Sequence, residues 1–254
     1  VHGIALANEF NKGYISDGRA NSVVVFDLKS LKKLNTVPIK GEGPDAIMYD
    51  PYTKRVFSFN GESHNAAVLD AKTDKEIGTV SLDGGPEFAI SDEKGHIYNN
   101  IEDKNSIAVI DAKDLKVVKT YSLEPGGTPT GLALDKKNHR LFSGCRKDKN
   151  MYVLDEYSGK IITKLPIGAG VDAVVYDPST SLIFCSNGDG TTTIIKQESA
   201  DQYKVVQTLN TEVRAKTMAL DPVTHKIYLS VAKFEPGTRT PVADSFEILV
   251  YKMK

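Results

Sequence analysis

The chain has 254 residues, 40% of them hydrophobic, and a formal net charge of −1. This length and composition supply enough apolar residues for a sizeable core, and no apolar run reaches the roughly 18 residues that a transmembrane helix needs. The lysines are spread singly instead of forming a basic stripe, so we expect neither a membrane span nor a nucleic-acid partner.

Short apolar runs, each ended by turn residues, recur along the chain at nearly constant spacing. An aromatic residue marks the second run of each copy, and the markers lie 43, 41, 44, 42 and 44 residues apart, at Tyr14, Phe57, Tyr98, Phe142, Phe184 and Tyr228. Each copy contains four such runs, except the last. The pattern predicts a four-stranded unit of about 42 residues, present six times.

In chain order, the predicted units span residues 1–40, 41–83, 84–124, 125–168, 169–211 and 212–254. Asp-Pro pairs at Asp50, Asp177 and Asp221 indicate tight turns between first and second strands. No connection is long enough for a crossover helix, so the strands are expected to be antiparallel. The last unit differs, because a long loop at 232–245 precedes its third strand at 246–251 and no fourth strand follows.

Repeated four-stranded antiparallel units of this length are typical of a β-propeller. We therefore predict an all-β fold with six blades in one domain, the last blade lacking its outer strand. A stacked solenoid is the alternative, but solenoid repeats usually contain a helix or have a shorter period. The two cysteines are predicted to stay unpaired, because Cys145 and Cys185 fall at different levels of neighbouring units.

The repeat resembles the YVTN-type β-propeller family, in which Tyr-Val-Thr-Asn occurs in the second strand. Degenerate forms of that motif occur here as Phe57-Ser58-Phe59-Asn60, Tyr98-Asn99-Asn100 and Phe184-Cys185-Ser186-Asn187. The resemblance implies a bacterial protein located in the periplasm or outside the cell. It also implies seven blades, with a further blade and a closing strand upstream of Val1; otherwise the sixth blade stays three-stranded.

A polar residue opens the first strand in every unit. Counted back from the end of that strand, these residues are His2, Asp45, Glu87, Thr130, Asp172 and Lys216. First strands line the channel of a propeller, so the six residues should surround its mouth. The exits of the second strands lie on the same face. From both groups we take as candidate ligand-binding residues His2, Asp45, Asn60, His64, Glu87, Asn100, Asp172, Asn187 and Lys216.

These residues support two hypotheses about function. The first is a non-catalytic, monomeric propeller without a cofactor that binds a protein, peptide or small ligand at the mouth, where loop 232–245 could act as a cap. The second is a divalent-cation-dependent hydrolase similar in layout to the lactonase propellers, with Ca²⁺ held by acceptor oxygens. Polar residues at a wet channel mouth are also expected without any ligand.

Other kinds of site find little support in the sequence. The absence of tryptophan argues against a pyrroloquinoline quinone enzyme, and no Cys-x-x-Cys-His motif is present for covalent haem. When the run at 187–190 is aligned on the invariant glycine of an EF-hand loop at Gly190, no Glu stands at the last ligand position, so a turn is expected there. Ser63 and His64 are adjacent and should point apart, which disfavours a serine hydrolase.

Overall fold

The computed structural model describes residues 2–235, 237–238 and 240–252, and almost all of these residues lie in β-strands or the turns between them. The strands form six antiparallel sheets, which we call blades one to six in chain order. This is the predicted β-propeller fold class. The chain divides into two compact units, Val1–Pro129 and Thr130–Lys254, with three blades each. The prediction of one domain over the entire chain stays a prediction.

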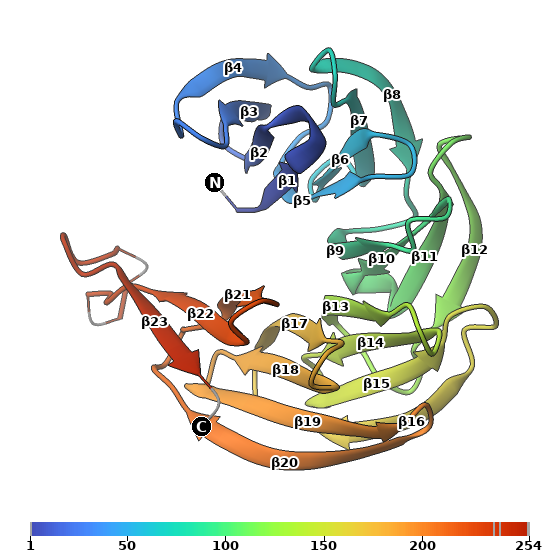
Figure 1. The fold of residues 1–254 in the computed structure, drawn as a ribbon, viewed down its shortest axis with the longest axis vertical. Coiled ribbons are helices and arrows are strands. Elements are labelled where there is room, and N and C mark those ends of the chain that lie inside the picture. The colour runs from blue at the N-terminus through green and yellow to red at the C-terminus, as the bar shows by residue number, and fades with distance from the viewer. Residues whose placement is uncertain (1, 236, 239, 253–254) are drawn as a thin grey trace. The chain divides into compact units, whose positions relative to one another are not determined.

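Three four-stranded blades make up the first unit (Figure 1). Blade one consists of β1 (Ile4–Ala7), β2 (Lys12–Asp17), β3 (Ser22–Asp27) and β4 (Lys33–Pro38). Blade two consists of β5 (Pro44–Asp50), β6 (Arg55–Asn60), β7 (Asn65–Asp70) and β8 (Lys75–Ser81). Blade three consists of β9 (Pro86–Ser91), β10 (His96–Ile101), β11 (Ser106–Asp111) and β12 (Lys116–Ser122). Two short 3-10 turns occur as well, η1 (Asn8–Phe10) and η2 (Glu102–Lys104).

The second unit contains two four-stranded blades and one three-stranded blade. Blade four consists of β13 (Pro129–Asp135), β14 (Arg140–Cys145), β15 (Asn150–Asp155) and β16 (Ile161–Pro166). Blade five consists of β17 (Val171–Asp177), β18 (Leu182–Asn187), β19 (Thr191–Ser199) and β20 (Gln202–Asn210). Blade six consists of β21 (Thr217–Asp221), β22 (Lys226–Val231) and β23 (Glu247–Lys252). All predicted blade boundaries fall in connections between strands.

The sequence explains why these elements form. The Asp-Pro turns close as expected, since the Asp50 carboxylate accepts a hydrogen bond from the Thr53 backbone N–H at 2.9 Å. In each of the five complete blades, the pairing of third and fourth strands contains a β-bulge on the fourth strand, and in blade five a second register shift follows it. No described residue belongs to a helix long and apolar enough to cross a membrane.

Within each unit, neighbouring blades pack face to face through the marker aromatics and aliphatic side chains. Tyr14 lies in the core of blades one and two, and burial raises the pKa of its hydroxyl group, which donates to the carbonyl oxygen of Ala71 at 2.8 Å. First strands approach closely: a Cβ atom on Gly131 of β13 would lie 2.5 Å from the backbone nitrogen of Val174 on β17. Only glycine fits at this crossing.

Individual side chains in the core can be compared with the sequence. Cys145 and Cys185 are buried and form no disulfide, as predicted, and Cys185 belongs to the apolar cluster of blades four and five. Ile4, an apolar residue of a first strand, is 60% exposed. The reason is that β1 packs against blade two through its other face, which carries Ala5 and Ala7.

Candidate functional site

A buried serine fixes the position of the predicted mouth residues in both units. Ser16 on β2 accepts a hydrogen bond from the Gly3 backbone N–H of its own blade at 2.8 Å and donates to the Asp45 carbonyl oxygen of the next blade. Ser186 makes the same pair of contacts, with the Ala173 N–H and the Lys216 carbonyl oxygen. The backbone of Asp45 and Lys216 is thus held, while their side chains are not part of this link.

In the first unit, two predicted residues from neighbouring blades meet. The imidazole Nδ1 of His2 lies 3.2 Å from a carboxylate oxygen of Asp45, and both side chains are about half exposed. They line a groove of about 530 Å³, to which Arg19 and Glu62 also contribute. Groups that both donate and accept hydrogen bonds therefore face the same opening.

In the second unit, the predicted residues Asp172 and Lys216 form an ion pair. The Lys216 Nζ lies 2.8 Å from Asp172 Oδ1, and an Arg146 Nη2 lies 2.9 Å from the same oxygen. The Asp172 side chain is only 13% exposed, whereas that of Lys216 is 43% exposed. One carboxylate thus faces two cations, and the Lys216 side chain is the more accessible of the two.

The three predicted asparagines lie inside the blades. Asn60, Asn100 and Asn187 are fully buried at the ends of their second strands. The Asn60 side-chain amide donates to the Asn65 side chain at 2.7 Å, and the Asn187 amide donates to the hydroxyl groups of Thr191 and Thr193. For Asn60 and Asn187 these contacts stabilise the hairpin between second and third strands.

His64 occupies a repeated turn position. Its φ of 49° is in the left-handed region, like those of its equivalents Asn21, Asn105 and Lys149. The His64 carbonyl oxygen accepts the backbone N–H of Leu82, and the same contact joins the corresponding residues of the other complete blades. The backbone of His64 is thus structural, and its exposed side chain projects from the turn.

The remaining first-strand residues also lie at the expected end of their strands. Glu87 is half-buried on β9, where its carbonyl oxygen accepts the side-chain amide of Asn99 at 2.8 Å. Thr130 is fully buried, and its hydroxyl group donates to the Val171 carbonyl oxygen of the next blade at 3.0 Å. Thr130 thus makes the link between blades that Ser16 and Ser186 make elsewhere.

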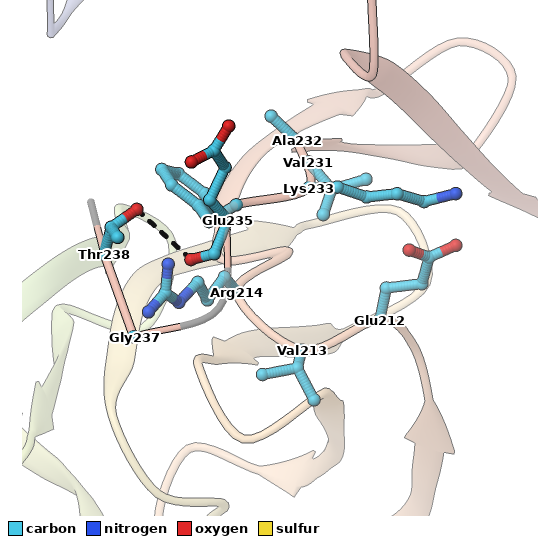
Figure 2. A pocket seen from close by; sticks show the side chains of 10 residues that line it. Glu212, Val213, Arg214, Val231, Ala232, Lys233, Glu235, Gly237 and Thr238 are labelled. Carbon is cyan, nitrogen blue, oxygen red and sulfur yellow. Dashed lines mark hydrogen bonds between the residues drawn. The ribbon is translucent and has the colours of Figure 1, made fainter. Parts of the chain in front are cut away.

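The second unit also contains a larger pocket. It has a volume of about 860 Å³ and lies between the connection from β20 to β21 and the loop after β22 (Figure 2). The Arg214 guanidinium group stacks 4.5 Å from the centre of the Phe234 ring, which joins the two walls. Figure 2 shows Arg214 directed toward the loop near Gly237. Charged side chains at the rim are Glu212, Lys233 and Glu235.

The residues present fit a calcium ion poorly. Among the described residues, no three His, Cys, Asp or Glu side chains are grouped in a way that could hold a metal ion. The carboxylate of Asp172 is engaged by Arg146 and Lys216, so a cation there would face two positive charges.

Candidate site residues were chosen by their position in the repeat, and this choice did not include Arg146, which pairs with Asp172, or Arg214 and Phe234, which contact each other. Arg146 follows β14 directly, and its charge opposes Asp172, so a search for complementary charges among strand exits could have found it. The contact between Arg214 and Phe234 had no such signal. It joins a connection to a long loop that has no counterpart in the other repeats.

Comparison with known proteins gives distant similarities. No family model matches the chain. Antigen Lp49 of Leptospira interrogans is 34% identical over 87 residues, which is 34% of this chain and 19% of that protein. YncE of Salmonella typhi is 26% identical over 195 residues, covering 74% of this chain and 54% of YncE. The chain thus spans about half the length of YncE, and much less of Lp49.

Solved structures with a similar fold include proteins of unrelated sequence. A structure of Kuenenia stuttgartiensis hydrazine synthase matches with a TM-score of 0.75 at 19% identity, covering 90% of this chain and 75% of that one. A structure of U3-55K has a TM-score of 0.81 at 9% identity, covering 99% of this chain and 80% of the other. These likenesses concern the fold, and together with the six repeated sheets they place the chain among the β-propellers.

Proposed function

We propose that this chain is a non-catalytic binding module that captures a peptide, protein or small polar ligand where its first strands begin. One observation carries the proposal: in both units, polar residues at the same repeat position of successive blades contact each other, as His2 contacts Asp45 and Lys216 contacts Asp172. Their backbones are fixed while exposed polar atoms remain at the surface. Such pre-organised polar groups can bind a ligand at low entropic cost.

The pocket lined by Arg214, two residues before Lys216 in the chain, supports the same proposal. Its volume falls in the range of roughly 300–1,000 Å³ that small-molecule sites occupy. Arg214 stacks on Phe234 and so holds one wall in place. A ligand with a carboxylate or another acceptor group suits the cation Arg214, and the loop after β22 would cover part of it.

Panning a random peptide library on the folded chain tests this proposal without a known ligand. Peptides enriched on the wild type should lose most of their affinity for Asp45→Lys or Lys216→Gln, which change accessible side chains of the site. Asp114→Lys is the matched control, because Asp114 is also exposed but lies in the turn between β11 and β12. Equal binding to all four proteins would refute the proposal.

Calcium provides a second test, directed at the hydrolase alternative. A ligand that binds the native state raises the melting temperature by mass action. We expect millimolar Ca²⁺ to leave the melting temperature unchanged, because Asp172 already faces two cations. A rise in melting temperature that EDTA reverses would favour the cation-dependent hydrolase over the non-catalytic binding module.

We also propose that the protein is a bacterial member of the YVTN-type propellers, exported and monomeric. Support comes from the degenerate motifs at Phe57, Tyr98 and Phe184, and from the similarity to proteins of Leptospira and Salmonella. Fractionation of cells that express the natural gene should recover the protein outside the cytoplasm. Recovery in the cytoplasmic fraction alone would contradict the proposed export.

A further inference from the structure

Arg214 occupies a repeat position at which three other blades carry glycine. The position lies two residues before the polar residue that opens a first strand, and its occupants are Gly43, Gly85, Thr128, Gly170 and Arg214. All but Gly85 have a left-handed φ, between 57° and 72°. Glycine adopts this conformation without strain, whereas the Cβ atom of an arginine crowds the backbone. Blade six thus places a long cationic side chain where blades two, three and five place none.

Arginine fits at this position because the loop after β22 leads away from it. In blade two, a Cβ atom on Gly43 would lie 2.8 Å from Cγ of Glu62. The Gly43 carbonyl oxygen accepts the N–H of Gly61, the first residue after β6, and blades three and five contain the same contact. Among the described residues, no such hydrogen bond joins Arg214 to Ala232, the first residue after β22. The two segments separate and leave the pocket between them.

Hydrogen bonds hold both walls of the pocket in place. The Arg214 backbone N–H donates to the Gly188 carbonyl oxygen of blade five at 3.0 Å. On the other wall, Phe234 pairs with Pro241 in a short antiparallel bridge. The Arg214 guanidinium group lies 4.5 Å from the centre of the Phe234 ring, so one of its faces is covered. No described lining residue belongs to β23, so the pocket does not depend on the outer edge of that strand.

The guanidinium group of Arg214 has no ion pair or hydrogen bond with any residue that the structure describes. Lys54 is a close match to Arg214, because it also has a left-handed φ, 60°, and lies over an aromatic ring, that of Phe10. The chain provides a carboxylate for Lys54, since an oxygen of Glu9 lies 2.7 Å from its Nζ. For Arg214, a carboxylate has to come from a ligand.

The charges of the lining favour a carboxylate over a phosphate group. The described lining contains two cations, Arg214 and Lys233, and two carboxylates, those of Glu212 and Glu235. Figure 2 shows both carboxylates directed away from the guanidinium group. A doubly charged phosphate would find no excess of positive charge here. A carboxylate needs only the planar pair of N–H groups that a stacked guanidinium presents.

Apolar side chains beside Arg214 define the rest of the ligand. Val213 is 66% exposed and Phe234 is 36% exposed, although both line the pocket. Such surface gains free energy when an apolar group of a ligand covers it. The α-carboxylate of an apolar amino acid lies directly beside an apolar side chain. An amino acid of this kind matches both features, either free or as the last residue of a peptide.

We propose that Arg214 anchors the ligand of this pocket by binding the α-carboxylate of an apolar residue. The guanidinium group donates two parallel hydrogen bonds to the carboxylate, and the apolar side chain of the ligand covers Val213 and Phe234. This inference rests on the proposed binding function and gives it a ligand class.

Leucine derivatives test the ligand class by isothermal titration calorimetry. N-acetyl-leucine should bind at least roughly tenfold more tightly than N-acetyl-leucinamide, which has the same apolar group without the charge. Inorganic phosphate should not displace N-acetyl-leucine. Equal affinities for the acid and the amide, or displacement by phosphate, would overturn the carboxylate assignment.

Free leucine distinguishes the two sources of the α-carboxylate. Its ammonium group can interact with the carboxylates of the lining, whereas the acetyl group of N-acetyl-leucine represents the preceding peptide bond. Tighter binding of leucine would assign a free amino acid, and tighter binding of N-acetyl-leucine would assign a peptide end. Binding of neither compound would overturn the inference.

Substitutions test the anchor itself. Arg214→Ala should weaken the binding of N-acetyl-leucine by about tenfold or more and leave that of the amide unchanged. Arg214→Lys keeps the charge without the planar pair of donors and should restore only part of the affinity. Lys54→Ala is the matched control and should have no effect, because it removes a similar cation outside the pocket. Equal affinities of the wild type and Arg214→Ala would refute the anchor.

Arg214→Gly covers the case in which the alanine variant folds poorly. Glycine relieves the strain of the left-handed φ, so this variant should melt about 2–4 °C above Arg214→Ala and bind N-acetyl-leucine equally weakly. A well-folded glycine variant with wild-type affinity would refute the anchor. Panned peptides that respond to Asp45→Lys and not to Arg214→Ala would also refute it, while the proposed binding module would remain.

Discussion

Single hydroxyl groups hold neighbouring blades together at the end where the candidate site lies. Ser186 is fully buried, accepts the Ala173 N–H and donates to the Lys216 carbonyl oxygen, so one side chain joins two blades. In the first unit Ser16 does the same. Removing a buried hydroxyl leaves both backbone groups without that partner, which costs more than the net value of a hydrogen bond.

Ser186→Ala should therefore lower the free energy of unfolding by about 1–3 kcal/mol. Urea denaturation measures this change directly. Ser199→Ala is a suitable control, because Ser199 is exposed at the end of β19 and its loss should have little effect. If both variants were equally stable, the proposed link between blades would be energetically unimportant.

Individual residues also show where prediction from sequence stops. The repeat placed His2, Asp45, Asp172 and Lys216 at equivalent positions, since each lies a fixed distance before the end of its first strand. It could not show that Asp172 would pair with Arg146 as well as with Lys216. Ion pairs depend on side-chain directions between blades, which a one-dimensional period does not contain.

Strands and their turns followed the sequence closely because their signals are local. Proline and aspartate fix the turns, and alternation of apolar residues fixes which strand face is buried. The exposure of Ile4 cannot be predicted from the sequence, because the same apolar pattern appears in a strand with one covered face and in a strand with two. The length of β19 and β20, nine residues each, was also not evident from the apolar runs.

The aspartates that end the third strands each accept hydrogen bonds within the turn that follows, and their protonation at low pH should destabilise the fold. The Thr73 side chain donates to Asp70, and the backbone N–H of Asp114 donates to Asp111, and these hydrogen bonds lower the pKa of both carboxyl groups below the usual 3.8. A carboxylate with a lowered folded-state pKa stabilises the fold above its unfolded pKa. That stability is lost as pH falls through the lower, folded value.

The free energy of unfolding should accordingly decrease as the pH falls below about 4. In the double variant Asp70→Asn, Asp111→Asn, the decrease should be smaller, because two of the titrating groups are gone. Thermal unfolding from pH 2 to pH 6 measures both proteins. Parallel curves would mean that the acid sensitivity arises in other carboxyl groups.

Taken as a whole, the molecule is nearly neutral, with a formal net charge of −1 and a sequence pI of about 6.6. Charge repulsion between molecules is weakest near the pI, and apolar residues at an open edge then favour association. The outermost strand β23 presents such residues at Ile248 and Val250.

Light scattering should therefore show the strongest attraction between molecules near pH 6.6. Val250→Lys adds charge to the middle of the β23 edge and should reduce the attraction at that pH. Lys substitution at the equally exposed Val118 of β12 is the control for added charge alone. A reduction of the same size in both variants would exclude a special role for β23.

The serine links join backbone atoms, and this has a consequence for how such a protein can diversify. Asp45 and Lys216 have opposite charges, yet the hydroxyl groups of Ser16 and Ser186 donate to their backbone carbonyl oxygens in the same way. A mutation can therefore replace the side chain at the start of a first strand without removing the hydrogen bond that joins the two blades. The side chains that contact a ligand can thus change while the links between blades are kept, so proteins with the same fold can evolve different binding specificities.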